Sequence, residues 1–229
     1  MQGAGTYTFQ FGVVFANLDK LLEGAWLTIQ LSAMAMALGL AVAVVCAFGA
    51  TNGARPVRWA VRGYVEAIRN TPFLVQLFII YFSLPAVGLR FDPVEAALVG
   101  MVVNLGAYAT EIVRAGIESV PRGQIEAGRA LGLSRLQVFR FVVLFPAVKA
   151  VFPALASQFI LLMLGSSIVS AISATELTAV TNTLQSTTFR AFEFYFMATG
   201  LYLAMALGFR AALGAIYWLV FRRGRGAAA

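Results

Sequence analysis

The sequence predicts an all-α membrane protein of about five transmembrane helices, with a short helix in the loop between spans three and four. Of its 229 residues, 60% are hydrophobic and 12% are charged, whereas about a quarter of the residues in soluble domains are charged. The apolar residues gather in long stretches without charge, and a helix needs roughly 20 such residues to cross a bilayer. The mean hydropathy of +0.83 agrees with lipid as the solvent for this surface.

Five stretches of the chain qualify as spans. The third reaches spanning length only by continuing past Glu111 toward Val113. The N-terminus lacks a basic start followed by an apolar core and a cleavage site, so we expect no removable signal peptide. No internal repeat or linker divides the sequence, which predicts a single membrane domain over residues 1–229. We place the spans at about residues 24–52, 70–89, 94–114, 148–175 and 194–221.

The basic residues outside the predicted spans lie mostly on one face of the membrane. Four arginines, including Arg69, separate spans one and two, six basic residues separate spans three and four, and three arginines follow span five. The opposite face receives only Lys20, Arg90 and Arg190. By the positive-inside rule, we expect the N-terminus outside the cell and the C-terminus in the cytoplasm. Arg210 then lies near the cytoplasmic end of span five, where its long side chain reaches the interface.

Missing residue types and motifs exclude several classes of function. The sequence has no histidine, and Cys46 is its single cysteine, which excludes disulfide frameworks, Cys/His metal sites and histidine-based catalysis. It also lacks a GxxxxGK[ST] loop, so it does not cradle a nucleotide phosphate in that way. The positive-inside arrangement explains the basic excess without a nucleic-acid partner. We therefore expect no catalytic residue, no bound metal and no cofactor in this chain.

The loop between spans three and four, about residues 119–137, carries its own helix signals. Pro121 suits a first helical turn, Gly132 suits a helix end, and Ser134 with Gln137 matches a capping box. The pattern predicts a helix, a sharp turn and a second helix. Small residues (Ala127, Gly128, Ala130 and Gly132) leave room for another protein's backbone, and Glu126 and Arg129 offer polar contacts.

Other interpretations of this loop are an ordinary helix packed on the bundle and a DNA-binding helix-turn-helix. The second is disfavoured, because no supporting three-helix core fits and the second helix runs straight into a span. Residue spacing alone does not separate a docking helix from an ordinary loop helix.

The loop resembles the permease subunits of ABC importers, whose cytoplasmic loop bears an EAA-type signature read here as Glu126, Ala127, Gly128 and then Gly132. Two departures are Gly128 in place of the second Ala of the signature and a proline shifted by one residue, to Pro146. The wider sequence is similar to the polar amino-acid branch, of histidine/glutamine/glutamate type. The segments that carry this likeness are GAWLTIQLS (24–32), RNTPFLVQLFIIYFSLP (69–85), NLGAYATEIVRAGIESVPRGQIEAGRALG (104–132), SSIVSAISATELT (166–178) and TFRAFEFYF (188–196).

The resemblance implies a transport subunit in a bacterial inner membrane, not an enzyme. It implies two permease chains, identical or homologous, two ATP-binding ABC subunits that hold ATP and Mg, and an extracytoplasmic amino-acid-binding protein. The loop would form the coupling helix that fits a cleft on the ATPase, and transport would follow alternating access. The residues expected to contact the ATPase are Glu126, Ala127, Gly128, Arg129, Leu131 and Gly132.

Polar side chains within the predicted spans are candidates for the substrate pathway, because such groups tend to face protein or water. Asn104, Tyr108 and Glu111 share one face of span three at spacings of four and three residues. The competing interpretation is that these groups form hydrogen bonds that hold the helices together. The full set of candidates is Gln76, Asn104, Tyr108, Glu111, Gln158, Ser166 and Ser167.

A stand-alone secondary transporter or channel is the alternative function. It would need ion-coupling carboxylates near mid-membrane or inverted repeats, and the sequence shows neither. A membrane-embedded enzyme is disfavoured because no nucleophile has a base beside it. The sequence does not specify which amino acid is carried.

Overall fold

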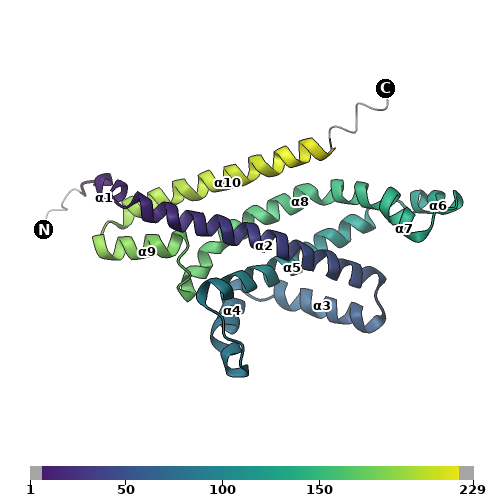
Figure 1. The fold of residues 1–229 in the computed structure, drawn as a ribbon, viewed down its shortest axis with the longest axis horizontal. Helices are drawn as coiled ribbons and strands as arrows, with labels where there is room; N and C mark the ends of the chain where they lie inside the picture. The colour runs from purple at the N-terminus through teal and green to yellow at the C-terminus, as the bar shows by residue number, and fades with distance from the viewer. Residues whose placement is uncertain (1–6, 222–229) are drawn as a thin grey trace, which may run out of the picture.

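The computed structural model describes residues 7–221, and all regular structure in this part of the chain is helical. The long helices run roughly along the longest axis, α6 lies at one end of the bundle and α9 at the other (Figure 1). We call these the α6 end and the α9 end. The elements are α1 (Phe11–Phe15), α2 (Leu18–Asn52), α3 (Arg55–Arg69), α4 (Phe73–Phe78), the π-helix η1 (Ile79–Ser83), the 3₁₀-helix η2 (Leu84–Val87), α5 (Pro93–Glu118), α6 (Arg122–Ala130), α7 (Arg135–Val138), the π-helix η3 (Phe139–Val143), α8 (Leu144–Gly165), the 3₁₀-helix η4 (Ser166–Ile172), α9 (Leu177–Thr188) and α10 (Ala191–Phe221).

Within residues 7–221, four helical segments are long and apolar enough to cross a membrane: Leu18–Asn52, Pro93–Glu118, Arg135–Ile172 and Ala191–Phe221. A further candidate is the pair formed by α3 and Phe73–Val87, which bends by 109°. With this pair counted as one span, the structure has the five spans that the sequence predicts. In α10 only 6% of the most apolar window is buried within the chain, which leaves most of this helix facing outward.

The second span differs from its predicted position at 70–89. It starts with α3 at Arg55, in a segment that we assigned to a loop because it holds four arginines. α3 is an amphipathic helix that packs on α2 and α5, and the Tyr64 hydroxyl donates a hydrogen bond to the Val103 carbonyl at 2.7 Å. Contacts on one face therefore hold a helix too polar for a lone span against the bundle, while most of its residues stay exposed and only Val65 is buried.

The bend in this span lies at Asn70–Pro72. Pro72 has no N–H to continue the ladder of α3, so the carbonyls before it lose their helical partners. The side-chain amide of Gln76 compensates, because its Nε2 donates to the carbonyl oxygens of Ile68 at 2.7 Å and Thr71 at 3.0 Å. The break is thus held in place by a side chain from the segment that follows it.

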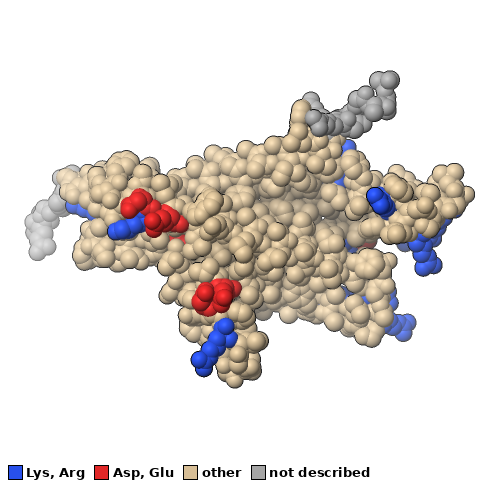
Figure 2. Space-filling model, viewed as in Figure 1, with Lys and Arg blue, Asp and Glu red and all other residues tan. Residues whose placement is uncertain are grey.

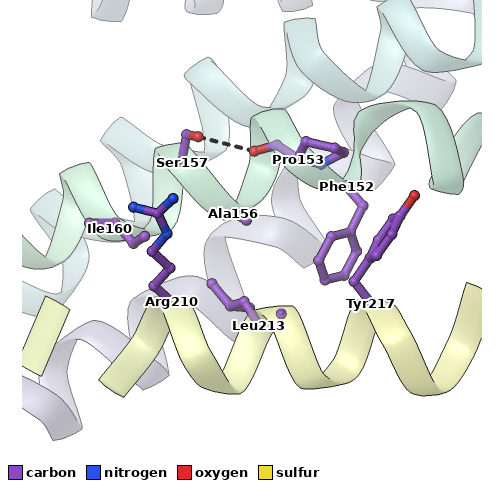
Figure 3. A pocket seen from close by; sticks show the side chains of 9 residues that line it. Phe152, Pro153, Ala156, Ser157, Ile160, Arg210, Leu213 and Tyr217 are labelled. Carbon is purple, nitrogen blue, oxygen red and sulfur yellow. Dashed lines mark hydrogen bonds between the residues drawn. The ribbon is translucent and has the colours of Figure 1, made fainter. Parts of the chain in front are cut away.

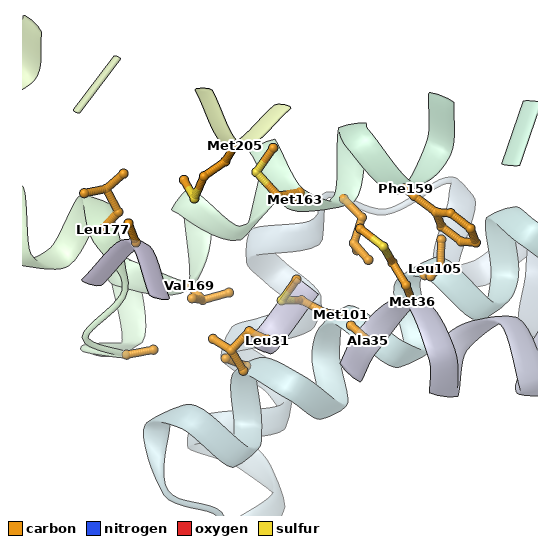
Figure 4. Packing of buried hydrophobic residues seen from close by; sticks show 14 of the residues in the cluster. Leu31, Ala35, Met36, Met101, Leu105, Phe159, Met163, Val169, Leu177 and Met205 are labelled. Carbon is orange, nitrogen blue, oxygen red and sulfur yellow. The ribbon is translucent and has the colours of Figure 1, made fainter. Parts of the chain in front are cut away.

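Close packing of α2 against α5 forms the centre of the bundle. A Cβ at Gly39 would lie 2.9 Å from the Leu105 side chain, so only glycine permits this approach. Small residues commonly let membrane helices pack closely. Methionines from several helices, among them Met36, Met101 and Met163, fill the space around this contact (Figure 4), as their flexible side chains allow.

The start of the fourth span contains a π-helical turn, η3, directly before α8. Pro146 lies in the first turn of α8 and has no N–H to bond the Val142 carbonyl four residues earlier. The wider π turn accommodates this missing bond. The shifted proline therefore coincides with a local change of helix type at this span, while the span itself continues to Ile172.

At the α9 end, the carboxyl group of Glu176 is fully buried and joins three helices. Its oxygens accept hydrogen bonds from the Tyr202 hydroxyl at 2.6 Å and the Ala179 N–H at 2.9 Å, and a longer one from the Thr28 hydroxyl at 3.5 Å. Burial raises the pKa of this carboxyl. Gly24 lets α9 approach α2, because a Cβ there would lie 3.0 Å from Leu177 Cα. We call this set the Glu176 cluster.

Charged side chains differ between the two ends. Lys and Arg gather at the α6 end, whereas the acidic side chains seen in this view lie toward the α9 end and on the protrusion that holds α4, each group with a basic side chain beside it (Figures 1 and 2). This distribution agrees with the separation of charge that we found along the sequence.

Candidate functional site

A cavity of about 540 Å³ lies between α3, α5 and α8, and we call it the central cavity. Tyr108 and Glu111 line it from α5 and Gln158 lines it from α8. These are three of the seven side chains that the sequence nominated for a substrate pathway. Arg69, the last residue of α3, lies in the same wall.

The one carboxylate that lines the central cavity is already paired within the chain. Arg114 donates to Glu111 from Nη2 at 2.7 Å and from Nε at 3.2 Å. The same guanidinium donates to both oxygens of Glu118, at 2.7 and 2.8 Å. Arg114 is therefore shared by two carboxylates, and the three side chains together carry a net charge of −1. The bidentate contact nevertheless engages both oxygens of Glu111.

Arg69 is the cavity residue that sequence reasoning missed. We counted it among the loop charges, but it lies at the bend of the second span, with its guanidinium 5.5 Å from the centre of the Tyr108 ring. Across residues 7–221, no carboxylate lies within ion-pair distance of it. The signal that could have located it is the Thr71-Pro72 break that follows, which ends a helix beside the arginine.

Gln76 and Asn104 lie outside the lining of the central cavity and bond to each other. The Asn104 amide donates to Gln76 Oε1 at 3.0 Å, while the amide nitrogen of Gln76 bonds the carbonyls at the bend. Gln76 is also buried. The contacts of this pair are those expected of groups that hold helices together.

Ser166 and Ser167 are also separate from the central cavity. Each hydroxyl bonds a carbonyl three residues earlier, Ser166 to Met163 at 2.7 Å and Ser167 to Leu164 at 3.0 Å. Both residues belong to η4, and Ser166 is completely buried. We predicted that both serines line the substrate pathway. In the structure their hydroxyls bond to carbonyls of the same helical segment, and neither serine lines the cavity that holds Tyr108 and Gln158.

A second cavity, of about 430 Å³, lies between α8 and α10 (Figure 3). Arg210 extends across it toward Ser157 and Ile160, and Tyr217 packs on Phe152 with ring centres 5.4 Å apart. No acidic residue lines this space. It contains none of the side chains that the sequence nominated for the pathway, so the central cavity is the stronger candidate.

The loop between the third and fourth spans forms the predicted helix, turn and helix. α6 ends in a left-handed Gly132 with φ of 77°, where the N–H of Leu133 bonds the Gly128 carbonyl and that of Gly132 bonds the Arg129 carbonyl. This is the Schellman pattern of a helix end. Ser134 and Gln137 form the predicted capping box.

The residues of α6 divide into an outward and an inward set. Glu126, Ala127 and Arg129 are exposed, and the Leu131 side chain is 81% exposed. Gly128 instead faces the chain itself, since a Cβ there would lie 3.3 Å from the side chains of Val138 and Val142. Gly128 therefore permits close packing of α6 on the helix that follows, which differs from the outward role that we expected of it.

Comparisons with known proteins agree with this geometry. The chain is 35% identical over 201 residues to the glutamine transport system permease protein GlnP of Escherichia coli (strain K12), covering 87% of this chain and 92% of that protein. It is 40% identical over 157 residues to the L-cystine transport system permease protein TcyB of Bacillus subtilis (strain 168), covering 69% and 67% of the two chains.

Solved structures share the fold. A chain from a crystal structure of an amino acid ABC transporter with histidines superposes with a TM-score of 0.85 at 33% identity, covering 92% of this chain and 99% of that one. A chain of the MetNI methionine ABC transporter in an inward-facing conformation superposes with a TM-score of 0.76 at 21% identity, covering 90% of this chain and 98% of that one, and shows likeness of fold alone. Residues 26–222 match the family described as "Binding-protein-dependent transport system inner membrane component". The chain therefore belongs to this family of ABC-importer permease subunits, which are multi-pass proteins of the inner membrane.

Proposed function

We propose that this chain forms half of the membrane pathway of an ATP-driven importer for polar amino acids. The relatives named for glutamine and cystine transport support this substrate class, and the central cavity supplies a guanidinium, a phenol and an amide for such a solute. In this proposal the α6 end is cytoplasmic, the N-terminus is outside and the C-terminus is inside, as the basic residues favour. Family membership favours a permease subunit over the stand-alone transporter that we kept as the alternative.

The chain works with partners that supply energy and substrate. Two ATP-binding subunits hold ATP and Mg, a second permease chain completes the pathway, and an extracytoplasmic binding protein delivers the amino acid. The chain itself needs no cofactor for this role. ATP binding moves the ATPase subunits, and the loop transmits that movement to the spans as a rigid-body change between two states.

The single observation that carries the proposal is the exposed face of α6 and its turn. The side chain of Leu131 is 81% exposed, and Glu126 and Arg129 of α6 are exposed as well. Together they form a small apolar patch with polar residues around it, which is the usual composition of a protein interface. The turn at Gly132 fixes the direction of this face. We assign the ATPase contact to Glu126, Ala127, Arg129, Leu131 and Gly132, with Gly128 supporting the helix from inside.

Affinity purification of the tagged chain tests the proposal directly. We expect an ATPase subunit and a permease chain to co-purify, and the reconstituted complex with its binding protein to take up glutamine when ATP is supplied. Purification of the chain without an ATPase, together with uptake driven by an ion gradient, would instead establish the stand-alone transporter.

The coupling role of the loop is tested by two substitutions at one turn residue. Gly132→Val places a β-branched residue at positive φ, which strains the turn, whereas Gly132→Asn tolerates that conformation. We expect Gly132→Val to lose ATPase retention and substrate-stimulated ATP hydrolysis, and Gly132→Asn to keep both. Chain abundance in the membrane is the folding control, and equal coupling in the two variants would contradict the assignment.

A further inference from the structure

The central cavity contains an imbalance between paired and unpaired polar groups. Its carboxylate, Glu111, is held by Arg114 in a bidentate pair at 2.7 and 3.2 Å. Arg69, which lines the same cavity, has no carboxylate within ion-pair distance in residues 7–221. Its guanidinium lies over the face of the Tyr108 ring and interacts with Glu111 only at longer range. Both oxygens of Glu111 are thus engaged by Arg114, whereas the N–H donors of Arg69 border the cavity without a carboxylate of the described residues bonded to them.

The neutral polar groups in the cavity are also unpaired. Within residues 7–221 neither the Tyr108 hydroxyl nor the Gln158 side-chain amide has a hydrogen-bond partner. A phenol and an amide both donate and accept hydrogen bonds, so they suit an uncharged or acidic polar side chain. An ammonium or guanidinium group would have to compete with Arg114 for the oxygens of Glu111, and Arg69 would repel it.

Arg69 is exposed where it borders the cavity, so its guanidinium is accessible to a solute. It ends α3 at the bend of the second span, inside the set of helices that cross the membrane. An ionisable group among such helices tends to face water or an opposite charge, and Arg69 faces the cavity. Every amino acid carries an α-carboxylate, which a guanidinium binds through two parallel hydrogen bonds.

Resting on the proposed function, we infer that Arg69 binds the α-carboxylate of the transported amino acid, and that the central cavity takes neutral polar and acidic amino acids in preference to cationic ones. Tyr108 and Gln158 then line the space that the side chain of the substrate occupies. Glu111 is paired with Arg114, so the guanidinium of Arg69 is the charged group that can bind the substrate.

Direct binding to the detergent-purified permease–ATPase complex, without the binding protein, isolates the selectivity of the cavity. The probe is radiolabelled glutamine, displaced by unlabelled glutamate, arginine or lysine. For the wild-type complex we expect saturable binding that glutamate displaces at concentrations about tenfold lower than arginine or lysine. A charge-assisted bidentate contact is worth about tenfold or more in affinity, so Arg69→Gln should raise the Kd for glutamine about tenfold.

Arg62→Gln is the matched control, because it removes the same charge from the same helix at a residue outside the lining of the cavity. We expect it to leave the Kd unchanged. Absence of saturable glutamine binding, preference for arginine or lysine, or a wild-type Kd in Arg69→Gln would each overturn the inference. Failure of the proposed function is distinguishable, since it would appear as a wild-type chain that co-purifies with no ATPase and supports no ATP-dependent uptake.

Discussion

Two groups of polar side chains within the bundle, the Glu176 cluster and the central cavity, differ in how completely they are paired. The fully buried Glu176 carboxylate accepts bonds from three helical neighbours, at 2.6, 2.9 and 3.5 Å. In the central cavity Arg69, Tyr108 and Gln158 keep unused hydrogen-bonding groups within the described chain. Leaving a buried polar group unpaired is costly, and the buried Glu176 carboxyl is fully bonded. Arg69 is exposed and Tyr108 and Gln158 are partly exposed, so their unpaired groups can meet water or a substrate.

The largest expected effect comes from removing the centre of the Glu176 cluster. Glu176→Ala removes the acceptor of the Ala179 N–H, at a cost of about 1–3 kcal/mol. It also removes the acceptor of the Tyr202 hydroxyl, which keeps its contact with the Thr178 hydroxyl at 2.8 Å and so adds a smaller loss. Glu176→Gln keeps an acceptor oxygen and the side-chain volume, so it should cost less. The melting temperature of the purified complex measures both, and equal melting of Glu176→Ala and wild type would show that the cluster contributes little.

A smaller loss is expected from crowding the contact that brings α9 onto α2. Gly24→Leu places side-chain atoms against the Leu177 backbone, and overpacking of this kind costs about 1–3 kcal/mol. Gly214→Leu is the matched control, because a Cβ at Gly214 meets nothing within 4 Å. Membrane abundance and melting temperature should fall for Gly24→Leu and stay unchanged for Gly214→Leu. A fall of the same size in both variants would show that the close contact between α9 and α2 does not explain the loss.

The smallest effect is expected at Ser167, which the sequence nominated for the pathway. Its hydroxyl bonds only the Leu164 carbonyl of its own helical turn and lies outside the lining of the central cavity. Ser167→Ala should change stability by less than about 0.5 kcal/mol and leave glutamine uptake near the wild-type rate. A strong loss of uptake at normal membrane abundance would show that Ser167 does contribute to the substrate pathway.

Local chemistry explains which features could be predicted from the sequence. The left-handed turn at Gly132 and the capping box of Ser134 and Gln137 depend on residues within a few positions of each other, and both are present. The number of spans follows from apolar length in the same way. These features need no knowledge of which helices pack together.

Features that depend on packing could not be predicted in the same way. α3 looked like a loop because its arginines suggest water, yet contact with α2 and α5 includes it in a bent span. That bend moves Arg69 into the wall of the central cavity, and the same bend uses Gln76 to bond free carbonyls. A polar residue in a span is therefore interpreted correctly only when its partners are known.

The central distinction between paired and unpaired groups is tested by one substitution made at two glutamines. The measurement is glutamine uptake per assembled complex in liposomes, taken with the melting temperature of the same preparation. Gln76→Ala removes an amide with four polar contacts and should lower the melting temperature. Gln158→Ala removes an amide without a partner in residues 7–221 and should leave the melting temperature unchanged while reducing uptake per complex several-fold. Normal uptake in Gln158→Ala, or an equal loss of stability in both variants, would contradict the account.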